Sequence, residues 1–261
     1  MIFDTHAHYD DAAFDEDREE IFARFPHAGI GMVCDVASTI PSIDAVLDIA
    51  HSHDFIVAAI GVHPSECEPM TGEQLDRIRD LCADPKVVAI GEIGLDYHWD
   101  TPERDLQKEW FEKQILLAQE VKKPIIVHSR DAAQDTMEIM KKCRAGRTGG
   151  VIHCFSYSLE MAREFIRMGF FIGIGGVVTF KNARKVKEVV AGIPLEKIVL
   201  ETDCPYMAPT PHRGERNSSL YLPIVARQIA ELKGTTADEV IEQTWKNAHL
   251  LYMMNETGEN L

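Results

Sequence analysis

The sequence predicts an α/β fold, a single (β/α)₈ barrel of the TIM type with additional C-terminal helices. The chain has 261 residues, and one such barrel commonly needs about 250. Eight short, β-branched apolar runs alternate with longer segments of helical spacing, as expected for buried parallel strands joined by helices. Polar residues follow many of these runs, at the barrel end where active sites form. An open, doubly wound sheet is the alternative fold.

The eight apolar runs define the expected strands in order. They cover residues 1–4, 29–36, 55–62, 86–93, 124–128, 150–153, 170–174 and 198–202. No linker or shift in composition separates the runs, so residues 1–261 are expected to form one domain.

The segments between the runs contain residues that typically begin helices. Thr71 with Gln74, and Thr236 with Glu239, match the capping box, in which side chain and backbone satisfy each other's free polar groups. Thr101-Pro102 places an N-cap residue before a proline in the first helical turn. The apolar face predicted for the helix that follows consists of Leu106, Trp110, Ile115, Leu116 and Ala118.

Two helices are expected after the last strand, over residues 220–232 and 236–253, where they would close the barrel. Residues 204–217, between the last strand and the first of these helices, contain three prolines and include Arg213. They are predicted to form a loop after the last strand, a position where barrels commonly bind phosphate.

The composition argues against several classes of protein. A hydrophobic fraction of 45% without low-complexity tracts excludes general disorder. No stretch approaches the roughly 20 apolar residues of a membrane span, and the acidic N-terminal residues do not resemble a secretion signal, so a cytoplasmic protein is expected. With 42 acidic and 27 basic residues the formal charge is −15. A polyanionic substrate would therefore require a local reversal of charge.

The six cysteines are widely spaced and contain no Cys-x-x-Cys pair. A thiolate zinc site or a redox motif is therefore not indicated. Reduced, mostly buried thiols are the expected state in a chain of this size.

Candidate site residues lie at the ends of six predicted strands. Because the carboxyl ends of barrel strands meet at one face, these side chains are expected to lie close together. They are His6, His8, His63, Glu92, His128, Arg130, His153, Glu201 and Asp203. Imidazoles that converge beside carboxylates suit zinc, manganese and similar divalent ions.

The spacing of His6 and His8 is weak evidence alone, because His51 and His53 have the same spacing where a helix is expected to end. A single buried histidine such as His128 is also more often a hydrogen-bonded core residue. The coincidence of four histidines and two carboxylates carries the metal-site prediction, because their burial without a cation would be costly. Among the other histidines, His27 and His249 are expected to be surface or helix residues, and His98 is unassigned.

These residues occur within motifs that resemble the TatD family of metal-dependent nucleases, within the amidohydrolase-like barrels, over essentially the whole chain. The motifs are Asp4-Thr5-His6-Ala7-His8, Gly61-Val62-His63-Pro64, Gly91-Glu92-Ile93-Gly94-Leu95-Asp96-Tyr97, His128-Ser129-Arg130, His153-Cys154-Phe155-Ser156, Leu200-Glu201-Thr202-Asp203-Cys204-Pro205-Tyr206 and Ala208-Pro209-Thr210-Pro211-His212-Arg213-Gly214.

The resemblance implies two divalent ions, with magnesium or manganese common and zinc also found. His6 and His8 would hold one ion, and His128 and His153 the other. Glu92 would bridge both ions as part of the catalytic centre. Asp203 would bind the first ion and orient or deprotonate the attacking water. Such proteins act as 3′–5′ deoxyribonucleases, and some relatives remove D-amino acids from tRNA.

The sequence departs from the family at two places. Tyr157 stands where a small residue is usual, and Asn217-Ser218-Ser219 replaces Asn-Glu-Pro. Both are expected in loops that face the substrate, so they put substrate choice in doubt.

Several further residues are substrate-binding or supporting candidates. Arg130, Lys181, Arg213 and Arg216 are placed near the mouth, because arginine can donate two hydrogen bonds to one phosphate. Arg213 has the best context, while ordinary solvated charge is the alternative for the others. His63 is expected to bind substrate or support a ligand. Glu201 would orient a ligand or coordinate a further ion.

Three aromatic residues, Tyr97, Trp99 and Tyr157, either stack on nucleobases or pack within the loops, and packing is favoured for Trp99.

The leading functional hypothesis is a metal-dependent exonuclease on single-stranded DNA or frayed ends, with RNA or tRNA as further candidate substrates and no membrane partner. Two metals would neutralise the phosphate and lower the pKa of a water molecule toward about 7. An ester or amide hydrolase such as a D-aminoacyl-tRNA deacylase is the second hypothesis, although Glu92 stands where related amide hydrolases often carry a carboxylated lysine. A metal-stabilised binding module without activity is the third.

Overall fold

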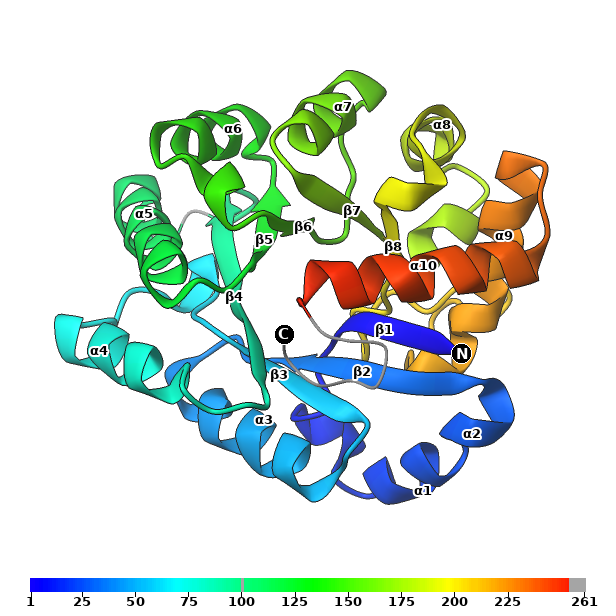
Figure 1. The fold of residues 1–261 in the computed structure, drawn as a ribbon, viewed down its shortest axis with the longest axis horizontal. Coiled ribbons are helices and arrows are strands. Elements are labelled where there is room, and N and C mark those ends of the chain that lie inside the picture. The colour runs from blue at the N-terminus through cyan, green and yellow to red at the C-terminus, as the bar shows by residue number, and fades with distance from the viewer. Residues whose placement is uncertain (100, 254–261) are drawn as a thin grey trace.

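Eight parallel strands form one sheet that curls into a nearly closed barrel (Figure 1). The computed structural model describes residues 1–99 and 101–253. The strands pair in sequence order, and a parallel bridge between Ala7 and Cys204 joins the two ends of the sheet. They are β1 (Ile2–Ala7), β2 (Ile30–Val36), β3 (Ile56–Ile60), β4 (Val87–Asp96), β5 (Ile125–Arg130), β6 (Gly150–Ile152), β7 (Phe170–Ile174) and β8 (Ile198–Leu200). The predicted barrel is confirmed.

The predicted strands lie close to the observed ones, and the largest changes are three-residue extensions at the ends of β1 and β4. Strand β4 ends at Asp96 instead of residue 93, because Leu95 and Asp96 continue the pairing with Ser129 and Arg130 of β5. The extension carries Asp96 to the mouth of the barrel, on the same strand as Glu92.

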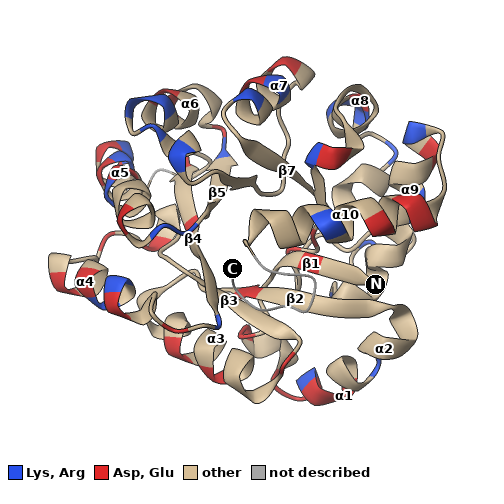
Figure 2. Cartoon of the chain, in the orientation of Figure 1, with Lys and Arg blue, Asp and Glu red and all other residues tan. Residues whose placement is uncertain are grey.

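Ten helices surround or close the barrel within the described residues (Figure 1). They are α1 (Arg18–Ala23), α2 (Phe25–Ala28), α3 (Ile40–Ser52), α4 (Gly72–Leu81), α5 (Arg104–Val121), α6 (Ala133–Lys142), α7 (Leu159–Arg167), α8 (Arg184–Gly192), α9 (Leu222–Lys233) and α10 (Ala237–Leu251). Lysine, arginine, aspartate and glutamate occur mainly along these helices and the loops, and the strands contain few of them (Figure 2).

Capping explains where several helices begin. The predicted boxes at Thr71 and Thr236 are present at the starts of α4 and α10. A third box begins α3, where Thr39 pairs with Ser42. The sequence pattern did not indicate this box, because serine replaces the glutamate or glutamine usual at the third position.

The predicted start of α5 is wrong. This helix begins at Arg104 after Glu103, so Thr101 is not its N-cap. The Gln107 side chain donates to the carbonyls of Asp96 and Pro102, and this holds the residues before the helix against the end of β4.

One member of the predicted apolar face of α5 is also misplaced. Leu116 is 54% exposed, whereas Leu117 is 2% exposed. Successive helical residues are separated by about 100° around the axis, so a shift of one position exchanges core for solvent.

Helix α10 closes the end of the barrel opposite the predicted site. Phe3 of β1 packs against the rings of Trp245, His249 and Tyr252. The Tyr252 hydroxyl also donates to the carbonyl of Thr5. His249 is therefore a buried helix residue and not a surface one.

The remaining histidine and cysteine expectations agree with the structure. His27 is an exposed residue of α2, and His51 and His53 lie at the end of α3. All six cysteines are free thiols, and four of them are buried. Among the described residues, no helix combines the length and apolar character needed to cross a bilayer.

Candidate metal centre

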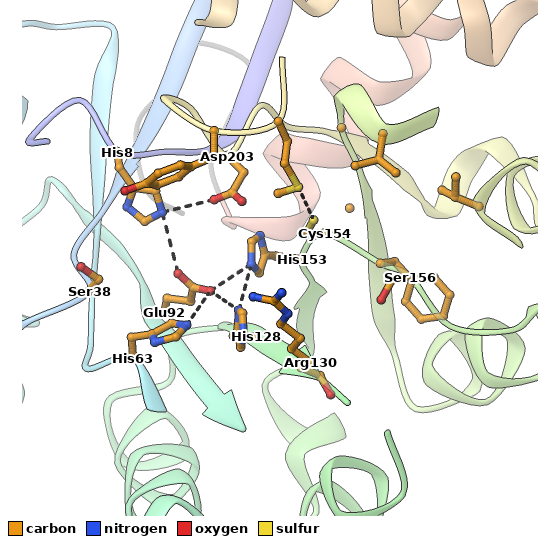
Figure 3. A pocket seen from close by; sticks show the side chains of 18 of the residues that line it. His8, Ser38, His63, Glu92, His128, Arg130, His153, Cys154, Ser156 and Asp203 are labelled. Carbon is orange, nitrogen blue, oxygen red and sulfur yellow. Dashed lines mark hydrogen bonds and ion pairs between the residues drawn. The ribbon is translucent and has the colours of Figure 1, made fainter. Parts of the chain in front are cut away.

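Two histidines converge on two carboxylates at the mouth of the barrel. His6 lies in β1, and His8 is the first residue after this strand. His6 Nε2 lies 3.1 Å from His8 Nε2 and 3.5 Å from Glu92 Oε2. Asp203 Oδ1 lies 3.6 Å from His6 Nε2 and 3.4 Å from His8 Nε2. Figure 3 shows His8, Glu92 and Asp203 turned toward one another. Residues from β1, β4 and the segment after β8 therefore present their donor atoms to one point.

A second group of imidazoles faces the other oxygen of Glu92. His128 Nδ1 is 2.8 Å and His153 Nε2 is 2.9 Å from Glu92 Oε1, and these two nitrogens are 3.4 Å apart. His63 Nε2 lies farther away, 3.8 Å from the same oxygen (Figure 3). The two oxygens of Glu92 thus face two different sets of histidines.

The chemistry of these donors fits divalent metal ions. Three groups of ligand atoms each lie within 4.8 Å of one another: His6 with His8 and Asp203, His6 with Glu92 and His153, and His63 with Glu92 and His128. Imidazole nitrogen and carboxylate oxygen suit zinc and manganese. His63, expected to contact substrate or support a ligand, can also reach a metal in this arrangement.

Buried histidines and carboxylates control one another's charge. Burial alone disfavours an ionised Glu92, but His153, His63 and His128 outweigh this and hold the pKa of the carboxyl well below its usual value. Burial likewise opposes a charge on His8, yet Asp203 raises the pKa of that imidazole to about 10. Burial, aided by the charge of His153, lowers the pKa of His6 to about 4. Such strongly perturbed groups in a cleft are typical of functional sites.

Hydrogen bonds on the far side of two rings fix the direction of their donor nitrogens. His8 Nδ1 lies 2.7 Å from the carbonyl oxygen of Val36, and His128 Nε2 lies 3.1 Å from Asp96 Oδ2. Metal-binding histidines generally have such partners, which set the tautomer and orientation. Asp96 was not assigned a role from the sequence. Its position four residues after Glu92 on one strand could have indicated it, because alternate residues share a face.

The backbone around Asp203 is tied to β1. The amide N–H groups of Thr202 and Asp203 both donate to the His6 carbonyl, and the His8 amide donates to the carbonyl of Cys204. Asp203 has a φ of 55°, a left-handed conformation that costs a residue with a side chain roughly 1–2 kcal/mol. These bonds maintain that conformation and keep the Asp203 carboxylate beside the two histidines.

Asp4 of β1 further stabilises the contact between β1 and the segment that contains Asp203. It is fully buried and accepts hydrogen bonds from the Thr202 amide, the Thr202 hydroxyl and the Ser219 hydroxyl. Burial raises the pKa of Asp4 to about 6, although these donors oppose the increase. No role was predicted for Asp4.

Glu201 lies behind His153, buried and away from the first donor group. Its Oε1 accepts from the Cys154 amide at 2.5 Å and lies 3.9 Å from His153 Nδ1, while Oε2 has no hydrogen-bond partner. Burial raises the pKa of Glu201 to about 8. The geometry fits a supporting position beside His153.

A cavity of about 1120 Å³ opens over the donor groups. His63 and Arg130 line it, as expected for substrate contacts, together with two basic residues that were not predicted, Arg184 and Lys185. This pair could have been indicated by its place in the connection after the seventh predicted strand, at the carboxyl end of the barrel where active sites form.

Three predicted basic residues do not line this cavity. Arg216 is paired with Asp17 at 2.5 Å, and Arg213 packs over the ring of Phe180. Lys181 lies just before the lining residues of α8 and outside them. The proline-rich loop therefore does not direct its arginines into the cavity.

The two family departures are not in the cavity lining, which corrects the expectation that both face the substrate. Asn217, Ser218 and Ser219 are buried, and the Asn217 amide donates to the carbonyls of Thr202 and Tyr206. The Tyr157 hydroxyl bonds to Ser129 and accepts from the Ala132 amide. These residues hold loops together.

The aromatic residues considered for base stacking differ in their surroundings. Tyr97 is a packing residue, because its hydroxyl donates to Asp135 and Arg104 covers its ring. Trp99 is 59% exposed, and its ring contacts only the neighbouring His98 ring among the aromatic contacts of the described residues. Tyr206, which was not singled out, lines the cavity and is 57% exposed.

Comparisons with known proteins agree with this geometry. The family model described as TatD related DNase matches residues 3–253. YabD of Bacillus subtilis, an uncharacterized metal-dependent hydrolase, is 48% identical over 255 residues, which cover 98% of this chain and 100% of the relative. YcfH of Escherichia coli, also an uncharacterized metal-dependent hydrolase, is 35% identical over 97% of this chain and 96% of its own length.

The fold matches as closely as the sequence. The crystal structure of YjjV, a TatD homologue from Escherichia coli, superimposes with a TM-score of 0.92 at 33% identity and covers 97% of this chain and 98% of that one. Family, relatives and barrel coincide over nearly the whole length, and so the chain belongs to the TatD family and is a metal-dependent hydrolase.

Proposed function

We propose that this hydrolase is a 3′–5′ exodeoxyribonuclease that trims single strands or frayed ends of DNA with two divalent ions. The main observation behind the proposal is the position of the Glu92 carboxylate. Its two oxygens face separate groups of imidazoles under one cavity. The family description adds nucleic acid as the substrate class.

The donor groups suggest how two ions would be held. His6, His8 and Asp203 would bind one, His128 and His153 the other, and Glu92 would contact both. The ions would be magnesium, manganese or zinc, in keeping with the nitrogen and oxygen donors. When bound, such a pair neutralises a phosphodiester and makes water available as a nucleophile near neutral pH.

Asp203 is the residue proposed to accept a proton from the attacking water. Its side chain is 15% exposed and lines the cavity. Burial opposes its ionisation, but His8, His153 and His6 hold the pKa of Asp203 below its usual value. The carboxylate is therefore ionised at neutral pH and available as a base. Asn at this position would retain the shape and lose the proton acceptor.

Two cavity residues are proposed to hold the substrate in place. Arg130 forms no ion pair with any described carboxylate and is free to bind a phosphate oxygen. His63 Nδ1 is held by Ser65, which leaves Nε2 directed toward the centre. RNA and tRNA share the phosphodiester and are secondary substrates to be tested.

The direct experiment is digestion of single-stranded DNA by metal-free protein supplemented in turn with magnesium, manganese or zinc. Substrate labelled at its 5′ end should shorten progressively, while a 3′ label should be released at once as a mononucleotide. Asp203→Asn should reduce kcat by about 100-fold or more, in the range of a lost general base.

Two results would overturn the proposal. Intact DNA under every metal condition would exclude nuclease activity, and turnover of D-tyrosyl-tRNA without turnover of DNA would assign the centre to deacylation. Asp48→Asn is the control, because Asp48 is exposed on α3, lies outside the cavity lining and belongs to none of the donor groups.

A further inference from the structure

The cavity extends well beyond the metal centre. One arm, called the α8 arm here, lies between the residues after β6, β7 and β8 and the first turn of α8. It is lined by Phe155, Val177, Arg184, Lys185, Val186 and Met207. Its walls combine an apolar surface with two cations, so its chemistry differs from that of the donor groups.

The apolar wall of the α8 arm is built on the core of the protein. Phe155 and Val186 are 4% and 6% exposed, and their contacts with the core keep them in place. Val177 and Met207 are half-buried and complete the surface. A concave apolar wall with few polar groups is the usual environment for a planar organic ligand.

The cations of the α8 arm have no local partners. Arg184 and Lys185 are exposed, and neither makes an ion pair with a carboxylate in the part of the chain that the structure describes. The first turn of α8 contains no acidic residue. In a chain with a formal charge of −15, two neighbouring unpaired cations on one cavity wall form a local region suited to an anion.

The opposite side of the cavity has the reverse charge. Asp10 and Asp11 follow β1, and Glu66 lies in the short helix after β3. A strand that carries one negative charge per phosphate would be repelled there and attracted toward Arg130, Arg184 and Lys185. The distribution of charge therefore gives the substrate one preferred side.

We propose that the α8 arm is a nucleotide subsite in which Arg184 and Lys185 contact phosphate while Phe155, Val177 and Met207 contact the base. The inference rests on the proposed function for the identity of the ligand, and it adds the side of the cavity along which the strand lies. It also predicts that the base itself contributes to binding.

The phosphate contacts can be tested by the salt dependence of binding. Metal-loaded protein would be titrated against a fluorescent, phosphorothioate-linked hexathymidylate, with affinity measured by anisotropy between 50 and about 200 mM salt. Each of Arg184→Glu and Lys185→Glu should weaken binding several-fold and reduce the slope of log affinity against log salt by about 0.7, the value for one lost contact on a single strand. Both residues are exposed, so these variants should fold.

Lys187→Glu is the matched control. Lys187 lies on the same helix outside the cavity lining, and the substitution changes the net charge equally. Equal losses in Lys185→Glu and Lys187→Glu would overturn the subsite, because they would indicate a long-range charge effect.

The base contact requires a second measurement. An oligonucleotide with abasic residues should bind the natural protein about tenfold less tightly, as expected for one lost base contact of about 1–3 kcal/mol. In Val177→Trp, which fills the α8 arm, the normal and abasic strands should bind nearly alike. Val177→Ala serves as a second variant and should give an intermediate difference.

The outcomes separate this inference from the proposed function. If the α8 variants alter binding while natural DNA is never hydrolysed, the subsite holds and the nuclease proposal fails. If DNA is hydrolysed but base removal and Lys185→Glu change nothing, the nuclease proposal holds and the subsite is overturned.

Discussion

Asp96 shows how a residue outside the donor groups can control a metal site. Its Oδ2 lies 3.1 Å from His128 Nε2, and its Oδ1 accepts from the His98 amide at 2.9 Å. Asp96 is itself 4% exposed. This fixed carboxylate can therefore hold the His128 ring so that Nδ1 faces Glu92.

Asp96→Asn should lower metal affinity about 10- to 100-fold, which is the usual effect of losing a partner behind a ligating histidine. Activity should fall at limiting metal and recover at high metal, because the donor atoms themselves remain. Isothermal titration with manganese would measure the affinity. The control is Asp131→Asn, at an exposed residue in the loop after β5, which should leave the manganese affinity unchanged. An equal loss of affinity in both variants would contradict the role of Asp96.

Asp35 makes stability depend on pH. This carboxyl on β2 is fully buried, and although the Tyr9 amide donates to Oδ1, Oδ2 has no partner. Burial and the neighbouring Asp10 raise the pKa of Asp35 to about 8. Above the unfolded pKa of about 4, the unfolded chain releases this proton while the native protein keeps it. The contribution of Asp35 to stability is therefore complete at acidic pH and is lost as pH rises toward 8.

Asp35→Asn should remove this dependence. The difference in unfolding free energy between Asp35→Asn and the natural protein should shift in favour of the variant between pH 4 and pH 8. The shift is at most about 1.4 kcal/mol per pH unit, and the difference should become constant above pH 8. Urea unfolding in chelator would measure it without a contribution from metal. Asp48→Asn, at an exposed residue of α3, is the control. Parallel pH profiles for Asp35→Asn and the natural protein would exclude the effect.

At the scale of elements, the ends of β1 and β8 must be held together for His6 and Asp203 to meet. The short helix Ser219–Tyr221 contributes to this contact, because the buried Ser219 hydroxyl donates to Asp4 at 2.7 Å and contacts the Tyr9 hydroxyl. The segment where the sequence departs from its family thus stabilises the site from behind.

Ser219→Ala should reduce the unfolding free energy by about 1–3 kcal/mol, because Asp4 would lose a donor in a buried environment. Chemical denaturation would measure the change. Ser218→Ala is a close control, since the adjacent Ser218 is also buried but its hydroxyl makes no hydrogen bond within the described residues. If both variants lost the same stability, the Asp4 contact would not be responsible.

Elements with a strong local signal were predictable from the sequence. The apolar runs located all eight strands, because a strand covered on both faces has little freedom to be polar. Thr71 and Thr236 located two helix starts through local hydrogen bonds. The start of α5 was misassigned because the contact of Gln107 with Pro102 depends on the position of β4.

The site could be predicted only in part for the same reason. His6 and Glu92 lie in the carboxyl-terminal halves of β1 and β4, Asp203 follows β8, and the barrel topology brings these strand ends together. The partners of Arg216, Asp96 and Ser219 lie on other elements. Their side-chain directions depend on packing that no local spacing records.

At the scale of the whole molecule, a metal that binds only the native state should stabilise the entire barrel. The donor residues come from β1, β4 and β5 and from the segments after β1, β3, β6 and β8, so they meet only when the barrel is closed. Metal at about 100 times its dissociation constant should add about 2.7 kcal/mol per site. For a protein of this size that corresponds to a rise in Tm of about 5 °C or more.

Thermal unfolding with manganese, with zinc and with chelator would measure this stabilisation. Glu92→Gln should lose most of the metal-dependent increase, because Glu92 is the residue shared by both imidazole groups. Glu66→Gln, in the same cavity but outside the donor groups, should keep it. The increase is compared with and without metal in each variant, so a change in metal-free stability does not enter the result. A Tm that chelator leaves unchanged in the natural protein would mean that the converging imidazoles and carboxylates hold no structural metal.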